Sequence, residues 1–306
     1  MTERVGVLVM AYGTPRDRDD IEVYYTDIRR GRPPEPQQLA DLTARYDALG
    51  GTFPLRAITE SQLDGIQSAL DAAEPDRFTV VLGTKHSAPS IEEGVAALAA
   101  DGLDRAVGLV LAPHWSTVSV GQYAAKAAAA GETHGVAVET VPSWHLLPAY
   151  VDFLARAVTD ALALVPGGEV VFTAHSVPER VVTMGDPYPM QLAETAQEVA
   201  ERLALPTWSV GWQSAGRTAE PWLGPDVLQI LTDRAGAQSP GVVICACGFT
   251  ADHLEVAYDL DIEAAGLARQ LGLPFARTRS INADPEVMAA LAQLVRQAAD
   301  ERSGAA

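Results

Sequence analysis

The chain has 306 residues, a length that favours about two domains. Its formal net charge of -18 argues against nucleic acid or an anionic membrane as the main partner, and it suits a protein that handles a metal cation. No apolar run reaches the roughly 18 residues of a membrane span, and the N-terminus turns polar too soon for a signal peptide, so we expect a cytoplasmic protein.

Short valine-rich runs alternate with longer helical patterns along the chain, which predicts βαβ units and parallel sheets. The first half offers strands at 5–11, 78–84, 106–112 and 136–142, and the second at 169–174, 208–213, 241–247 and 274–280. We therefore predict an α/β chain of two Rossmann-like domains, 1–145 and 146–306, each with a four-stranded parallel sheet flanked by helices. The pattern leaves open whether the last helix packs back on the first domain.

Two helices have readable starts, since Ser90 and Glu93 can form a capping box and Asp284 precedes a proline. The insertion at about 15–60, between the first two strands, has no counterpart in the second half. Ligands of open α/β sheets bind beyond the carboxyl ends of the strands. Two such domains facing each other would form an active-site cleft there, and we expect the insertion at its mouth.

His175 comes directly after one predicted strand, and Glu255 follows a neighbouring one. A histidine and a carboxylate can together bind a divalent metal or transfer protons near neutral pH. His253 should point away from Glu255 along a helix, which indicates an outer or structural role. The motifs that hold nucleotide phosphates are absent, and "GWQSAG" does not have the G-x-S-x-G spacing of an α/β hydrolase.

Glu255, Asp259 and Glu263 are four residues apart and would form one ridge on a helix. Like charges at this spacing repel each other by roughly 0.2–0.5 kcal/mol per pair. The ridge is either a solvated face of an acidic protein or a set of oxygen ligands for a cation. Local sequence leaves both interpretations open.

Seven segments resemble the ferrochelatases, most closely the coproporphyrin type of Gram-positive bacteria, and they occur in the family's order: "VLVMAYGTP", "YYTDIRRGRPP", "LAPHWSTVSVGQY", "TAHSVPE", "GDPYP", "VGWQSAGRTAEPWLGPDV" and "GFTADHLEVAYDLDIE". The resemblance implies the chelatase fold and a lyase of heme biosynthesis that inserts ferrous iron into coproporphyrin III to form coproheme. Three alternatives remain: a protoporphyrin IX ferrochelatase, a non-catalytic tetrapyrrole or metal carrier, and a chelatase that inserts cobalt or nickel into a corrin precursor.

The resemblance also implies roles for single residues. His175 and Glu255 match the residues that hold iron and help to remove the pyrrole protons. Asp259 and Glu263 match further metal-side acids on a helix with π character. Tyr12 matches an axial ligand of the inserted iron.

The substrate-binding residues implied by the resemblance lie nearer the N-terminus: Arg29, Arg45, Tyr46 and Tyr123 match the porphyrin rim. Lys85 and His86 match an outer metal position. Phe53 stands where the coproporphyrin enzymes have a serine that contacts a propionate, and Thr52 is its potential replacement. An acidic protein that binds a tetra-anionic porphyrin needs such local cations, and guanidinium groups suit carboxylates.

Iron is a substrate in this interpretation, and no resident cofactor is required. Cys245 and Cys247 are too few for the four ligands of a [2Fe–2S] cluster, so we interpret them as buried thiols, with a degenerate site or one shared between chains left open. The charged, proline-broken insertion has no continuous apolar face for membrane insertion. We expect a monomer whose partners are coproporphyrin III and ferrous iron, with the downstream coproheme decarboxylase as a candidate for transient contact.

Overall fold

The computed structural model describes residues 3–51, 54–216 and 218–303. The chain divides into two compact units. The described parts of the first fall within Met1–Ala112, Ser119–Pro142 and Asn282–Ala306, and the second comprises Pro113–Val118 and Ser143–Ile281. Each unit contains one four-stranded parallel sheet.

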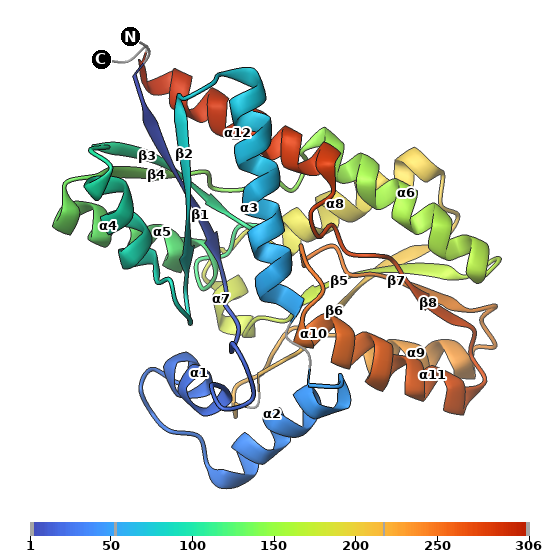
Figure 1. The fold of residues 1–306 in the computed structure, drawn as a ribbon. Helices are drawn as coiled ribbons and strands as arrows, with labels where there is room; N and C mark the ends of the chain where they lie inside the picture. The colour runs from blue at the N-terminus through green and yellow to red at the C-terminus, as the bar shows by residue number, and fades with distance from the viewer. Residues whose placement is uncertain (1–2, 52–53, 217, 304–306) are drawn as a thin grey trace. The chain divides into compact units, whose positions relative to one another are not determined.

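The sheet of the first unit has the order β2-β1-β3-β4, formed by β1 (Val5–Ala11), β2 (Phe78–Thr84), β3 (Arg105–Val110) and β4 (Ala137–Thr140). Every residue of β1 is buried, as expected for a parallel strand covered on both faces. Two helix pairs cover the sheet (Figure 1): α3 (Pro54–Ala73) with α12 (Pro285–Ser303), and α4 (Ile91–Ala100) with α5 (Val120–His134).

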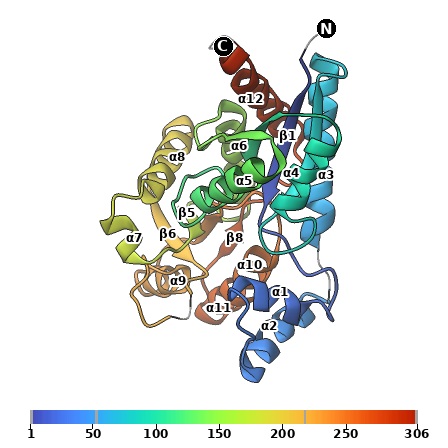
Figure 2. The ribbon, with the colours of Figure 1, turned by 90° about the vertical axis from the view of Figure 1, so that its left-hand side faces the viewer.

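The insertion after β1 forms two helices, α1 (Ile21–Ile28) and α2 (Pro36–Ala48), which pack side by side (Figure 2). Arg18 reaches both carboxylate oxygens of Asp47 at 3.0 and 2.8 Å, tying the entrance of α1 to the end of α2. The Tyr24 hydroxyl donates to the carbonyl of Gly13 at 3.2 Å. These bonds hold the insertion beside the carboxyl end of β1.

The second unit repeats the topology with the order β6-β5-β7-β8, formed by β5 (Glu169–His175), β6 (Trp208–Gln213), β7 (Val242–Cys245) and β8 (Phe275–Arg277). Its helix pairs are α6 (Pro148–Leu164) with α8 (Tyr188–Leu203), and α9 (Val227–Gly236) with α11 (Ala265–Leu271). Three short helices complete it: α7 (Glu179–Thr183), α10 (Leu254–Val256) and the π-helix η1 (Ala257–Ala264).

All eight predicted strands are confirmed, and the two sheets share one strand order. The limits differ most at β8, predicted at 274–280, and then at β4 and β7, because these strands leave the hydrogen-bonded ladder earlier than their predicted ends. His175 closes β5 and does not follow it. The capping box of α4 is confirmed: Ser90 Oγ accepts from the Glu93 N–H at 3.1 Å, and Glu93 accepts from the Ser90 N–H at 2.6 Å.

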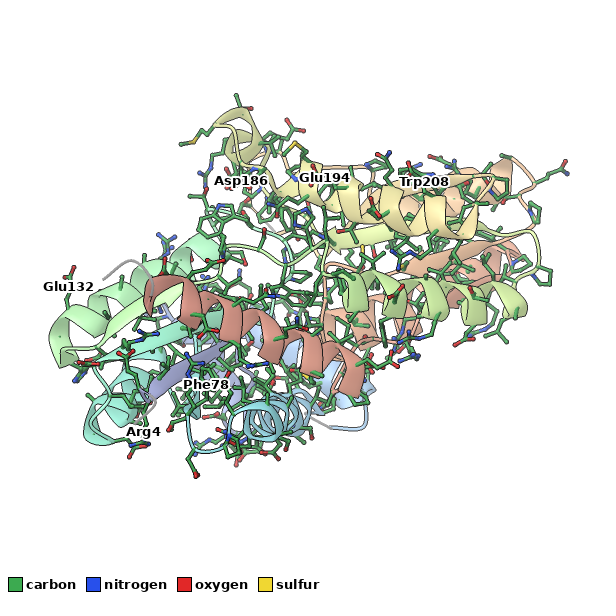
Figure 3. All side chains as sticks on the ribbon, turned by 90° about the horizontal axis from the view of Figure 1, so that it is seen from above. Arg4, Phe78, Glu132, Asp186, Glu194 and Trp208 are labelled. Carbon is green, nitrogen blue, oxygen red and sulfur yellow. The ribbon has the colours of Figure 1, made fainter. Side chains whose placement is uncertain are left out.

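The last helix belongs to the first unit and packs against α3. Arg77, which is 9% exposed, donates to Glu74 and Asp300 at 2.6 Å each, and Arg296 of α12 reaches Glu74 at the same distance. The two carboxylates offset the free-energy cost of burying the charged Arg77 guanidinium. The guanidinium also lies over the ring of Phe78, at the start of β2 (Figure 3). The domain limits 1–145 and 146–306 remain a prediction.

Within the part of the chain that the structure describes, no helix combines the length and the apolar character needed to cross a bilayer.

Candidate active site

In each sheet the strand order changes direction at the first strand, because β2 and β3 flank β1 and β6 and β7 flank β5. Such a switch point is where open α/β sheets bind ligands, beyond the carboxyl ends of the strands. Tyr12 directly follows β1, and His175 is the last residue of β5. Tyr12 and His175 are therefore at the switch point of their own unit.

His175 and Glu255 form an ion pair in the second unit, with 3.6 Å between Nε2 and Oε1. Nδ1 of His175 lies 2.6 Å from the carbonyl oxygen of Ser176, so Nδ1 carries a proton and Nε2 is directed to the carboxylate. The side chains are 38% and 36% exposed, so a ligand can reach both.

The charge state of this pair follows from competing effects. Burial alone lowers the pKa of His175, but the Glu255 carboxylate, the Ser176 carbonyl and the charge of Asp259 outweigh it and raise the pKa to about 9. Burial likewise raises the pKa of Glu255, and the charges and hydrogen bonds of His175 and His253 bring it well below its usual range. The metal-free pair is an imidazolium and a carboxylate at neutral pH.

His253 also contacts the pair, so its predicted orientation away from Glu255 is wrong. Its Nε2 lies 3.7 Å from Oε2 of Glu255, and its Nδ1 lies 2.9 Å from the carbonyl oxygen of Ala251. The reason is the backbone: His253 is extended (φ -151°, ψ -176°) and precedes α10, so the helical spacing does not apply to it.

The acidic ridge continues from Glu255 onto η1, and the predicted π character is confirmed. Asp259 is buried and accepts a 2.5 Å hydrogen bond from the Ser214 hydroxyl, whereas Glu263 is exposed. On the same helix, Asp261 forms a bidentate pair with Arg277 at 2.6 and 2.7 Å. The ridge therefore combines one fixed carboxylate with one that is free to meet solvent.

Tyr12 leads a second group of site residues, in the first unit. The chain turns sharply directly after Tyr12, at Gly13, which has φ +93°. Only glycine fits there, because a Cβ at this position would lie 2.4 Å from the Ser87 hydroxyl oxygen. The Tyr12 ring is 43% exposed and meets the edge of His86 with 4.7 Å between centroids. The Lys85 ammonium lies 6.0 Å from the Tyr12 ring and 5.2 Å from the buried ring of Tyr123.

This group concentrates positive charge. Burial, together with the charges of Lys126 and Arg30, lowers the pKa of Lys85 to about 8. His86 forms a 2.7 Å contact between Nδ1 and Oδ2 of Asp27 on α1. Asp27 was not predicted as a site residue, although it lies inside the "YYTDIRRGRPP" segment that resembles the family.

The predicted rim residues of the insertion lie at helix ends. Arg29 caps the C-terminus of α1, where its side chain donates to the Arg32 carbonyl at 3.2 Å. Arg45 lies half-buried in the last turn of α2, and Tyr46 next to it is buried. Thr52 and Phe53 lie outside the described residues, so the propionate contact expected to change there stays a prediction.

The ferrochelatase family model matches residues 4–299. The chain belongs to the ferrochelatase family. It is 42% identical to a ferrochelatase of Herpetosiphon aurantiacus, over 93% of this chain and 96% of the relative. It is 41% identical to a coproporphyrin III ferrochelatase of Halalkalibacterium halodurans, over 98% of this chain and 99% of the relative.

A solved sirohydrochlorin chelatase from Bacillus subtilis subspecies spizizenii, in complex with cobalt, has the same fold. Its TM-score is 0.60 at 10% identity, with 98% of this chain and 97% of that chain covered. The predicted chelatase fold, with its two sheets flanked by helices, is confirmed.

In this ferrochelatase-family chain Cys245 and Cys247 are free and buried. The Cys247 thiol faces the carbonyl of Thr173 at 3.7 Å, and burial raises its pKa well above the usual range. Among the described residues, no three or more His, Cys, Asp or Glu side chains gather as a preformed metal site.

Proposed function

We propose that this chain inserts ferrous iron into coproporphyrin III and releases coproheme. The observation that carries the proposal is the His175–Glu255 pair, continued by acids on a π-helix, in a chain of the ferrochelatase family. The coproporphyrin specificity is supported by the name of the Halalkalibacterium halodurans relative, which aligns over nearly the whole of both chains.

The proposed chemistry exchanges two pyrrole N–H protons for one Fe²⁺, which is a substrate. Binding of the metal displaces the Nε2 proton of His175 to solvent, and the neutral imidazole nitrogen and the Glu255 carboxylate can then ligate the ion. The Glu255 carboxylate can also accept a proton. Asp259 and Glu263 add oxygen ligands of the kind that a hydrated cation accepts.

The proposed porphyrin contacts come from the first unit. Tyr12 is exposed and serves as the axial ligand of the inserted iron. Arg29, Arg45, Tyr46 and Tyr123 form the rim, and Arg29 and Arg45 hold propionates. Lys85 and His86 hold an outer metal ion. The concentration of Lys85, Lys126 and Arg30 adds positive potential for an anionic substrate.

We further propose a cytoplasmic monomer that has no resident cofactor, does not enter a membrane, and meets the downstream coproheme decarboxylase transiently. The alternatives are protoporphyrin IX as the substrate, and a carrier that binds tetrapyrrole or metal without turnover. Iron, zinc and cobalt are to be compared in the same assay, because nitrogen and carboxylate ligands accept several divalent ions.

The test of substrate choice is an anaerobic, detergent-free insertion assay. We expect a higher kcat/KM for coproporphyrin III than for protoporphyrin IX, because two more propionates can pair with cations. Arg29→Ala and Arg45→Ala should each lower kcat/KM on coproporphyrin III by roughly 10- to 100-fold, since a hydrogen bond to a charged group contributes about 1.5–3 kcal/mol, less where solvent screens it.

Arg4→Ala is the matched control, since Arg4 is exposed and precedes β1, at the amino end of the sheet (Figure 3). Its kcat/KM should equal that of the wild type. A preference for protoporphyrin IX, or arginine variants without loss, would overturn the coproporphyrin assignment. Porphyrin binding without insertion of any metal would favour the carrier.

The ridge makes a separate prediction. Asp259→Asn with Glu263→Gln should raise the apparent KM for iron several-fold more than it lowers kcat at saturating iron, because the two acids act before the pair receives the ion. Asn at 259 keeps an oxygen for the Ser214 hydroxyl, so folding should be retained. Initial rates over a range of iron concentrations give the KM for iron and the kcat separately.

The control variant, Glu132→Gln with Glu198→Gln, removes the same charge from exposed positions on α5 and α8. It should leave the iron dependence unchanged. If the ridge variant behaves like this control, the ridge is a solvated acidic face.

A further inference from the structure

Gln213 connects both members of the His175–Glu255 pair, although it belongs to neither. It is the last residue of β6, is 1% exposed, and lies directly opposite His175 in the parallel ladder. Its backbone carbonyl accepts the Ser176 N–H at 2.8 Å. The backbone of Gln213 thus fixes the point where the chain leaves β5, directly after His175.

The side chain of Gln213 reaches the other member of the pair. Its Nε2 donates to the backbone carbonyl of Glu255 at 3.0 Å, and its Oε1 accepts from the Thr173 hydroxyl at 2.9 Å. The amide orientation follows from chemistry, because the Glu255 carbonyl only accepts and must face the NH₂ group. One buried amide therefore links β5 to the backbone that carries the catalytic carboxylate.

Glu255 lies near the start of a helical segment, two residues after the extended His253, and α10 continues without a break into the π-helix η1. The first turn of a helix has backbone groups without partners inside the helix. The hydrogen bond from the Gln213 side chain ties the Glu255 backbone, in this first turn, to the end of β6.

Ser214 extends the arrangement by one residue. Its backbone is left-handed (φ 60°), a conformation unusual for serine, and its hydroxyl donates to Asp259. Two successive residues at the end of β6 therefore hold two successive acids of the ridge. A strained backbone held by such a contact is typical of functional sites.

We propose that Gln213 is a positioning residue that sets the separation between His175 and Glu255. This inference rests on the proposed function, because the separation between His175 and Glu255 is taken to serve iron insertion. Outer groups that orient metal-binding side chains typically change metal affinity or activity by roughly 10- to 100-fold when they are replaced.

The test replaces Gln213 by Met and by Leu, which both keep a buried apolar side chain of similar length and remove the amide with its donor to Glu255. Both variants should lower kcat by about 10- to 100-fold and leave coproporphyrin III affinity, measured by fluorescence quenching, within about twofold of the wild type. Affinity for Co²⁺, measured by absorption titration, should fall in parallel.

Thr173→Val separates positioning from stability, because it removes the other partner of the amide and keeps the Gln213–Glu255 bond. It should lower Tm by as much as Gln213→Met does, with a smaller loss of kcat. Equal kcat losses, or Gln213 variants with wild-type kcat and Co²⁺ affinity, would overturn the positioning role. A wild-type chain without insertion activity would overturn the proposed function, and the Co²⁺ titration would still test Gln213.

Discussion

Replacing His175 by Ala or Glu255 by Gln should abolish iron insertion while porphyrin still binds. The two side chains lie 3.6 Å apart in the second unit, where His175 is the last residue of β5. Each variant therefore removes one of the two groups proposed to hold the metal and accept protons. We expect kcat to fall by about 10²- to 10⁴-fold, because acid–base catalysis typically contributes a factor of this size.

Coproporphyrin III affinity, measured by fluorescence quenching, should stay near that of the wild type, because the proposed propionate contacts lie on the first unit. His134→Ala and Glu132→Gln, both on α5, repeat the two changes outside the site and should keep full activity. Substantial turnover by both His175→Ala and Glu255→Gln would remove the pair from the chemistry. Loss of porphyrin affinity would assign it to substrate binding instead.

The fold could be predicted because its signals are local. The run "VGVLVMA" is long enough for one strand and apolar on both faces, so it indicates a buried parallel strand without any knowledge of its neighbours. The ends of β4, β7 and β8 could not be predicted as well, since the ladder ends where the partner strand diverges and not where the apolar run stops.

The site was predictable only in part. His175 was predicted at the end of one strand and Glu255 after another, and the family resemblance assigned their roles, but the contacts around them depend on tertiary structure. Gln213 is 42 residues from Glu255, and Asp27 is 59 residues from His86, so no local pattern reports either contact. His253 was misplaced because helical spacing was applied to a residue that lies just before the helix.

The acidic ridge could likewise be predicted only in part. The four-residue spacing of the acids is visible in the sequence and the π character came from the resemblance, whereas the burial of Asp259 depends on Ser214, which approaches from β6. Sequence spacing therefore identified which acids share a helix, and only the structure separated the fixed acid from the exposed one.

A buried histidine in the second unit should make the protein sensitive to acid. His114 is 2% exposed, and its Nε2 lies 2.9 Å from the Thr195 hydroxyl oxygen, on α8 one turn after Gln191. The Thr195 hydroxyl oxygen lies 3.1 Å from the carbonyl oxygens of both His145 and Gln191, and it donates its single proton to one of them. Because that proton is used there, Nε2–H of His114 donates to the Thr195 hydroxyl oxygen. Nδ1 of His114 has no hydrogen-bond partner among the described residues.

Protonation of His114 would place a charged N–H where the described residues offer no acceptor. Burial, with a smaller effect of the neighbouring His145, accordingly lowers the pKa of His114 from 6.5 to about 3. Below pH 6.5 the unfolded chain binds a proton at this residue and the folded chain does not, so the free energy of unfolding falls as the pH falls from 6.5 towards 3. At pH 4.5 the loss from this residue amounts to up to about 3 kcal/mol.

His114→Gln should remove this loss. The variant should be less stable than the wild type at pH 7.5, because the packing and the bond to Thr195 change, and the stability gap should close or reverse at pH 4.5. Urea unfolding at both pH values measures it. Thr195→Val is the matched control, since it removes the hydrogen bond to His114 and keeps the imidazole. Its stability deficit should not narrow as the pH falls, and a His114→Gln deficit that stays equally constant would show that His114 does not control the response to acid.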